Sequence, residues 1–154
     1  MKNCLFFNAV NINGKICHNI IMRPRGINGA RRGTQERENK MDCVFCSIAA
    51  GDIPSAKVYE DEHVLAFKDI NPQAPVHIVF IPKKHVMSSL DDYDYALHAD
   101  VIARIFAAIA SVARDLGLTS GYRIINNCGK DAGQTVRHLH FHLLAGADMG
   151  EKLL

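Results

Sequence analysis

The chain has 154 residues, 48% of them hydrophobic and 22% charged, which is the composition of one globular domain at roughly 100–200 residues per domain. No uninterrupted apolar run approaches the ~18 residues of a membrane span, and no signal core precedes the five cysteines. We therefore expect neither a membrane protein nor a secreted disulfide framework, and a reducing, cytoplasmic location is favoured. Residues 41–154 carry ten basic and fourteen acidic side chains, which argues against electrostatic capture of nucleic acid.

The first forty residues have the composition of an appendage. They contain eight basic and two acidic side chains, seven asparagines and no serine, without sustained periodicity of 2 or 3.6. We expect residues 1–40 to be a disordered or dispensable N-terminal extension, and residues 41–154 to form the domain. Two alternatives stay open for the extension: an organellar presequence, or sequence upstream of a true start at Met41.

Two helices are predicted in the domain. Residues 42–51 form a short one that Gly51 closes. Residues 92–116 place apolar side chains at i, i+3, i+4 and i+7 spacing, which predicts a long amphipathic helix stopped by Gly117.

Five short strands complete the predicted elements. Their segments are bounded by turn residues, and most neighbours along the chain are separated by short connections. Five strands with two helices in this order predict an α+β fold built on a five-stranded antiparallel sheet. The predicted strands are residues 57–60, 63–68, 76–81, 122–126 and 138–144.

The strongest chemical signal is the run His-Leu-His-Phe-His-Leu-Leu at residues 138–144. Because side chains of a strand alternate between its faces, His138, His140 and His142 should form one row, with the apolar residues between them facing the long helix. One interpretation is a run of surface histidines. The others are a metal site, or an anion site in which one imidazole attacks and its neighbours donate hydrogen bonds.

The loop before this row carries neutral hydrogen-bond donors and a glycine. Neutral donors beside imidazoles suit a phosphate, whereas a catalytic metal site more often adds a carboxylate. Asp69, just beyond the second strand, either caps a turn or accepts hydrogen bonds from both hydroxyls of a ribose. His77 shares a strand face with Val79 and Ile81. The loop residues in question are Asn127, Gly133, Gln134 and Thr135.

Motifs spread from about residue 42 to residue 149 resemble the histidine triad (HIT) family, whose signature is His-x-His-x-His followed by two apolar residues. The chain most closely resembles the Hint branch, the histidine triad nucleotide-binding proteins. The supporting motifs are Cys-Val-Phe-Cys-Ser-Ile at residues 43–48, Pro-Gln-Ala-Pro at 72–75, Ile-Pro-Lys-Lys-His at 81–85 and Gly-Gln-Thr-Val at 133–136. The resemblance implies a HIT-like fold whose sheet joins that of a second copy in a homodimer.

The resemblance also implies a purine nucleotide-binding hydrolase that cleaves the P–N bond of nucleoside 5′-phosphoramidates and releases AMP or GMP. His140 would attack the α-phosphorus and become nucleotidylated, His142 would donate to a phosphoryl oxygen, and Thr135 would help to protonate the leaving amine. The catalytic residues so implied are His138, His140, His142 and Thr135. The nucleotide-binding residues so implied are an apolar purine pocket of Val44, Phe45, Ile48 and Ile70, then Asp69 on the ribose, and Asn127, Gly133, Gln134, Thr135, Val136, His140 and His142 around the phosphate.

Other functions stay open at this point. A tris-histidine metalloenzyme would lose all activity on metal stripping, but it leaves the Gly-Gln-Thr loop unexplained. A non-catalytic nucleotide-binding or scaffold protein would keep the pocket and the dimer without turnover. A dinucleoside polyphosphate hydrolase shares the Gly-Gln-Thr-Val motif, but that branch usually continues well past the triad, whereas twelve residues follow His142 here.

Cys43 and Cys46 have a spacing common in zinc sites, although alone they are half a site. Some bacterial-type HIT proteins resemble an arrangement that completes it with two histidines, which here are His85 and His138. Such a closed site would be structural, so the chemistry itself needs no cofactor. A thioredoxin-like redox pair is the alternative, which the bulky Val44-Phe45 insert disfavours.

Overall fold

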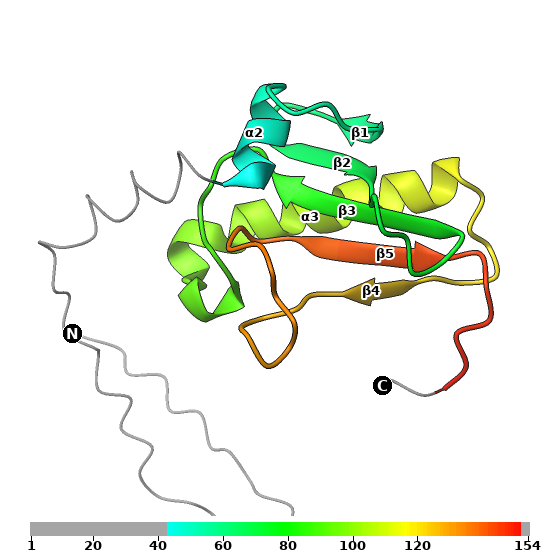
Figure 1. Ribbon diagram of the computed structural model, residues 1–154. Coiled ribbons are helices and arrows are strands. Elements are labelled where there is room, and N and C mark those ends of the chain that lie inside the picture. Colours follow the sequence, from blue (N-terminus) through cyan, green and yellow to red (C-terminus); the bar gives the residue numbers. More distant parts are fainter. Residues whose placement is uncertain (1–42, 152–154) are drawn as a thin grey trace, which may run out of the picture. The chain divides into compact units, whose positions relative to one another are not determined.

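The fold is described by a computed structural model that covers residues 43–151. Its elements follow the order α2, β1, β2, β3, a 3₁₀ turn, α3, β4 and β5 (Figure 1). The N-terminal extension expected at residues 1–40 lies outside the described residues, so its nature stays a prediction.

The short helix α2, Val44–Ala50, ends where the sequence predicts. Cys43 precedes it in an extended conformation, with φ −85° and ψ 112°. Gly51 ends it with a φ of 88°, a left-handed conformation that glycine adopts at little cost. The Gly51 N–H then donates to the carbonyl of Ile48, which satisfies one of the last free carbonyls of the helix.

The long helix α3, Tyr95–Asp115, starts later than its apolar pattern predicts. Leu90–Asp92 form a separate 3₁₀ turn, because the Ser89 hydroxyl accepts a hydrogen bond from the Asp91 N–H there. Helix α3 begins where the Asp94 carboxylate accepts from the Ala96 N–H, in the manner of an N-cap. The predicted start at residue 92 is therefore wrong by three residues.

The predicted antiparallel sheet is confirmed, with the strand order β1-β2-β3-β5-β4. Every neighbouring pair in it is antiparallel. Strand β3 lies at the centre, between β2 and β5, and β4 forms one edge (Figure 1). The strands are β1 Lys57–Glu60, β2 Val64–Lys68, β3 Val76–Pro82, β4 Arg123–Ile125 and β5 Phe141–Ala145.

The last strand begins three residues later than predicted. Of the three histidines in the row, His142 belongs to β5, whereas His138 and His140 lie in the segment that leads into it. That segment is held by the Leu139 N–H, which donates to the carbonyl of Met87 rather than to a neighbouring strand. Ladder pairing with β3 starts only at Phe141, opposite Phe80.

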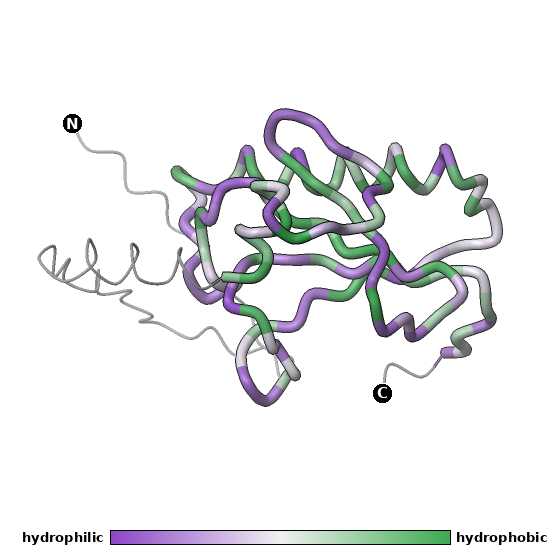
Figure 2. Tube along the Cα trace, turned by 45° about the horizontal axis from the view of Figure 1, so that its top comes forward, coloured by the Kyte–Doolittle hydropathy of each residue, from purple (hydrophilic) through white to green (hydrophobic). Residues whose placement is uncertain are grey.

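The two faces of the sheet have separate apolar cores. One core joins Phe80, Leu139 and Leu143 to the buried stripe of α3, including Ile105 and Ile109. The second core lies on the opposite face, under α2. It consists of Ile48, Leu65, Phe67, Val79 and Ile81. The two helices cover opposite faces of the sheet in Figure 1, and hydrophobic and hydrophilic residues are interspersed along the trace in Figure 2.

By length and composition, α3 is also apolar enough to cross a membrane, the one such helix among residues 43–151. A search for an uninterrupted apolar run misses it, because Asp100 and Arg104 interrupt its sequence. Its apolar stripe packs on the sheet, with Ile105, Ile109 and Val112 almost fully buried. This packing accounts for the apolar stripe of α3, whereas Leu97, 73% exposed, and Phe106, 44% exposed, lie outside it.

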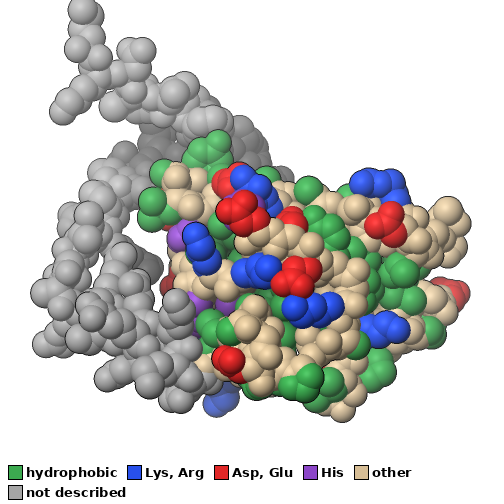
Figure 3. Space-filling view, turned by 90° about the horizontal axis from the view of Figure 1, so that it is seen from above, with side chains coloured by type: hydrophobic (Ala, Val, Ile, Leu, Met, Phe, Trp, Pro, Cys, Tyr) green, Lys and Arg blue, Asp and Glu red, His purple; other side chains and the backbone are tan. Residues whose placement is uncertain are grey.

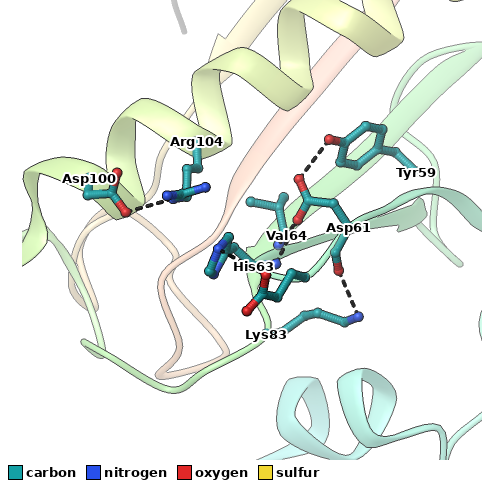
Figure 4. Close-up of polar contacts among 8 residues, drawn as sticks. Tyr59, Asp61, His63, Val64, Lys83, Asp100 and Arg104 are labelled. Carbon is teal, nitrogen blue, oxygen red and sulfur yellow. Dashed lines mark hydrogen bonds and ion pairs between the residues drawn. The ribbon is translucent and has the colours of Figure 1, made fainter.

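The turn between β1 and β2 is organised by Asp61 (Figure 4). One carboxylate oxygen of Asp61 accepts hydrogen bonds from the N–H groups of His63 and Val64, and the other accepts from the Tyr59 hydroxyl. Burial alone would raise the pKa of Asp61, but these hydrogen bonds outweigh it and lower that pKa. Lys83 then donates to the Asp61 carbonyl at 2.8 Å, which ties the turn to the end of β3.

Charges of both signs are interspersed on the face of the domain shown in Figure 3. The ion pairs of the domain include Lys57 with Glu60 and Arg104 with Asp100. The described face in that view therefore lacks the contiguous basic patch of a nucleic-acid-binding surface.

Candidate active site

Three histidine side chains form a row on the face of the sheet that α2 covers. The rings of His140 and His142 are 5.1 Å apart between centroids, and the ring of Phe45 from α2 lies against both His138 and His140. Leu139 and Phe141, between the histidines, point into the core under α3. The period-of-two prediction is therefore confirmed, because an extended backbone alternates its side chains whether or not it is paired.

His140 is held in one tautomer by the backbone. Its Nδ1 lies 2.7 Å from the carbonyl oxygen of His138, and since a carbonyl only accepts, Nδ1 must carry the proton. Nε2 of a neutral ring is then unprotonated, with a lone pair available to attack. Burial lowers the pKa of His140, although the His138 carbonyl and the Asp69 charge oppose that shift, so the neutral ring is favoured. Asn126 fixes the backbone here by donating to the His140 carbonyl at 2.7 Å.

His142 lies between the row and a second pair of polar side chains. Its Nδ1 is 2.8 Å from Nε2 of His77 and 3.9 Å from a carboxylate oxygen of Asp69. Burial, with the neighbouring His140 and His77, lowers the pKa of His142 to about 4, although Asp69 opposes the shift. The ring is therefore neutral near pH 7.

The loop at residues 126–137 is braced by Gln134. Its side-chain oxygen accepts from the Gly129 N–H, and its Nε2 donates to the carbonyls of Ser88 and Val136. The side-chain donors of Gln134 are thus already engaged within the fold. Gly133 has a φ of 76°, which favours glycine at this turn, and the side chain of Thr135 is exposed.

The expected apolar purine pocket is divided between surface and core. Ile48 belongs to the core under α2. Phe45 contacts His140, with 5.3 Å between ring centroids. Val44 is 41% exposed and Ile70 is 91% exposed. Phe45 thus contacts the histidine row and packs against the core that contains Ile48. Val44 and Ile70 are exposed to solvent.

Cys43, Cys46, His85 and His138 come together as a cluster of possible metal ligands. Cys43 Sγ lies 3.5 Å from Nδ1 of His138, and Cys46 Sγ lies 3.3 Å from Nδ1 of His85 and 3.6 Å from Nδ1 of His138. All four ligand atoms lie within 4.8 Å of one another.

These distances fit a tetrahedral zinc site. With Zn–S near ~2.3 Å and Zn–N near ~2.0 Å, a tetrahedron places sulfur and nitrogen about 3.5 Å apart. His138 also has the required tautomer: its Nε2 donates to the Pro82 carbonyl at 2.8 Å, which leaves Nδ1 unprotonated beside the sulfurs. Zinc-binding histidines typically donate their second N–H to such an acceptor.

Three contacts in the site cannot be predicted from the sequence. They are made by the side chain of Asn126 and by the backbone carbonyls of Ser88 and Pro82. Asn126 is adjacent to Asn127, and no pattern in the sequence of this loop separates the two asparagines. Ser88 and Pro82 contribute carbonyl oxygens, which every residue has. No side-chain pattern reveals such a role.

The antiparallel sheet and the buried row of histidines define a class of small α+β proteins with a histidine triad. The HIT domain family matches residues 50–149, and the chain belongs to this family.

Known relatives agree with this assignment. An uncharacterized 13.2 kDa HIT-like protein of Azospirillum brasilense is 50% identical over 108 residues, covering 70% of this chain and 88% of its own. A solved HIT family hydrolase from Clostridium thermocellum is 51% identical, with a TM-score of 0.70 over 73% of this chain and 97% of that one. A histidine triad nucleotide-binding protein from Candida albicans is 34% identical, with a TM-score of 0.60 over 66% of this chain and 73% of that one.

Proposed function

We propose that the protein is a Hint-type nucleotide hydrolase that cleaves the P–N bond of purine nucleoside 5′-phosphoramidates. The observation that carries the proposal is the tautomer of His140, whose Nδ1–H is held by the His138 carbonyl and whose Nε2 lone pair is left free. A nucleophilic imidazole needs this arrangement. The hydrolase and nucleotide-binding names of the two solved neighbours also support it.

The reaction would run in two displacements. Nε2 of His140 forms a bond to the α-phosphorus while the P–N bond breaks, and the leaving amine takes a proton with help from the Thr135 hydroxyl. His142 donates a hydrogen bond to a non-bridging oxygen as negative charge builds there. Water then attacks the phosphorus, the P–Nε2 bond breaks, and the nucleoside monophosphate leaves. The proton of the attacking water returns to the solvent, which supplied the proton of the leaving amine through the Thr135 hydroxyl.

The test of this function is AMP release from adenosine 5′-phosphoramidate, with diadenosine triphosphate as the competing substrate. We expect kcat/KM to be higher for the phosphoramidate. A preference for diadenosine triphosphate would assign the dinucleoside polyphosphate hydrolase activity instead. Binding of AMP without turnover of either compound would leave a non-catalytic nucleotide-binding protein.

Asp69 is assigned to the ribose in this proposal. Its Oδ1 accepts from the Asn71 N–H at 2.8 Å, and its other oxygen lies 3.4 Å from His77, beside the histidine row. We expect Asp69→Ala to weaken ribonucleotide binding by about 1–3 kcal/mol, because the ribose hydroxyls lose their acceptor. Calorimetric titration with AMP and with its 2′,3′-dideoxy analogue measures this loss.

The comparison of the two ligands separates binding from folding. The dideoxy analogue should lose much less affinity than AMP does on Asp69→Ala. Asp69→Asn keeps an oxygen for the Asn71 N–H, so it preserves the turn and should still weaken AMP binding. Equal losses for both ligands would assign Asp69 a folding role instead.

A homodimer and a structural zinc ion belong to the same proposal. Strand β4 is an edge of the sheet, and an edge can pair with the same strand of a second copy. Its three residues, Arg123–Ile125, are half-buried within one chain. The zinc ion would be held by Cys43, Cys46, His85 and His138, and would stabilise the fold without entering the chemistry.

A further inference from the structure

The two cysteines of the proposed zinc site stand on either side of Phe45 in the sequence. Cys43 directly precedes helix α2, and Cys46 lies in the first turn of that helix. Their sulfur atoms are within 4.8 Å of each other. Cys43 is 8% exposed, whereas Cys46 is half-buried. The two thiols are therefore close together, and Cys46 is the more accessible of them.

A disulfide between these cysteines is within reach, but it requires the first turn of α2 to move. Residues three apart on a helix surface have Cβ atoms about 5–6 Å apart, whereas a disulfide needs a Cβ separation of about 3.5–4.5 Å. Val44 and Phe45 lie inside the loop that such a disulfide closes, so they move when it forms.

Phe45 transmits this movement to the nucleophile of the proposed reaction. Its ring lies edge-on to the rings of His140, His138 and Phe67, at centroid distances of 5.3, 6.0 and 5.8 Å. When the first turn of α2 moves, the ring of His140 keeps its hydrogen bond to the His138 carbonyl but loses the packing of Phe45. Its orientation toward a phosphorus atom is then less well fixed.

His138 is a second connection between the cysteines and the nucleophile. Its Nδ1 lies 3.5 Å from Cys43 Sγ and 3.6 Å from Cys46 Sγ, and its carbonyl accepts the Nδ1 proton of His140. Zinc is held by thiolates, so a disulfide removes two of its four ligands. The two imidazoles that remain are too few for a closed four-coordinate site. Oxidation of the cysteines would therefore release the metal and free Nδ1 of His138.

We infer that Cys43 and Cys46 form an oxidation site, at which hydrogen peroxide joins the two sulfurs in a disulfide and thereby lowers the activity of His140. This inference rests on the proposed function, in which His140 attacks phosphorus and the cluster holds zinc. The role differs from that of a thioredoxin-like exchange pair, because the disulfide acts on the active site of its own chain. In a reducing compartment such disulfides are transient and serve in redox sensing.

The oxidation takes two steps. The thiolate of Cys46 attacks one oxygen of hydrogen peroxide, the O–O bond breaks, and a sulfenic acid forms with release of hydroxide. The thiolate of Cys43 then attacks the sulfur of Cys46, the S–O bond breaks, and a second hydroxide leaves. The two sulfurs lose two electrons in total, and the peroxide is reduced to two hydroxide ions, which take protons from the solvent.

The test treats the zinc-loaded, full-length protein with hydrogen peroxide. We expect about one equivalent of zinc to pass to a chromogenic chelator, and the peptide that contains both cysteines to lose the mass of two hydrogens. We expect kcat for adenosine 5′-phosphoramidate to fall about 10-fold or more, because His140 loses the contacts that orient it. Dithiothreitol with added zinc should restore kcat.

Two variants identify the sulfur atoms responsible. Cys46→His keeps a ligand atom for zinc but cannot form the disulfide, so its zinc and its kcat should resist peroxide. Cys128→Ser removes a cysteine outside the cluster and should respond to peroxide as the wild type does. Resistance of Cys128→Ser would overturn the inference, as would a wild-type disulfide that forms without loss of kcat. These two results decide the question even where Cys46→His does not fold.

NMR spectra of histidine-labelled protein test the same change without any substrate. An aromatic ring shifts the resonances of its neighbours, so we expect the ring resonances of His140 to change when oxidation displaces Phe45, and to return on reduction. Unchanged resonances in the disulfide form would overturn the inference. Absence of turnover in the wild type would contradict the proposed hydrolase alone, because the disulfide, the zinc and the resonances are measured independently. A wild type that turns over substrate but holds no zinc would overturn the inference and leave the hydrolase standing.

Discussion

We expect His140→Ala to lose on the order of 10⁴-fold or more in kcat for adenosine 5′-phosphoramidate, because the variant lacks the nucleophile. The side chain has a single candidate attacking atom, Nε2, since Nδ1 is bonded to the His138 carbonyl. Phe45 packs on the ring and limits its movement. Single-turnover reactions quenched in acid-free conditions and read by mass spectrometry should show a nucleotide adduct on His140 in the wild type.

Loss of activity must be separated from loss of structure in this experiment. His140 is 4% exposed, so its truncation leaves a small cavity and an unpaired His138 carbonyl. The thermal unfolding midpoint of the variant should therefore be measured with its activity, and His63→Ala serves as a control outside the site. Near-normal turnover by a folded His140→Ala variant would contradict the assignment, as would an adduct on another residue.

The row of histidines could be predicted from the sequence because its signal is local. Extended backbone alternates side chains with period two, so residues 138, 140 and 142 share a face even though β5 begins only at Phe141. The late start of β5 was not predictable, since it depends on the bond from Leu139 N–H to the Met87 carbonyl, a contact between distant segments. The sheet could be predicted for a similar reason, because the apolar patterns of short strands and the turn residues between them lie within short stretches of sequence.

The proton positions in the site could not be predicted in the same way. The tautomer of His140 is set by the His138 carbonyl, a group that every residue possesses. Which backbone group meets which ring depends on the conformation of loops. The roles of Gln134 and Asn126 also depend on the conformation of the loops, because an amide side chain can bind a ligand or form hydrogen bonds within the protein.

The proposed zinc site gives the second large expected effect. Cys46→Ser replaces a thiolate ligand with a hydroxyl that binds zinc poorly, and we expect zinc to fall from about one equivalent per chain to below a tenth, since a closed structural site is otherwise nearly filled. The thermal unfolding midpoint should fall by on the order of 10 °C, because zinc binding contributes to the free energy of folding. Metal analysis of protein purified without chelator, and calorimetry, measure the two effects.

Cys128→Ser is the matched control for this substitution. Cys128 is a half-buried free cysteine outside the cluster, so its variant should keep its zinc and its unfolding midpoint. Wild-type protein with reduced cysteines and less than about a tenth of an equivalent of zinc would end the zinc proposal, because structural sites bind tightly.

The proposed zinc site should also affect catalysis, because His138 belongs both to the cluster of possible metal ligands and to the histidine row. Its ring provides a ligand atom to the cluster through Nδ1, and its carbonyl accepts the proton of His140. Without the metal, Nδ1 of His138 would lose its ligand bond, and the ring would be held by the hydrogen bond from Nε2 to the Pro82 carbonyl. We expect Cys46→Ser to lower kcat about 10-fold at temperatures where it is folded, as a shifted carbonyl holds the tautomer of His140 less firmly. Long-range ¹H–¹⁵N correlation spectra of histidine-labelled protein report that tautomer directly. An unchanged Nδ1 proton on His140 in zinc-free protein would show that the two sites are independent.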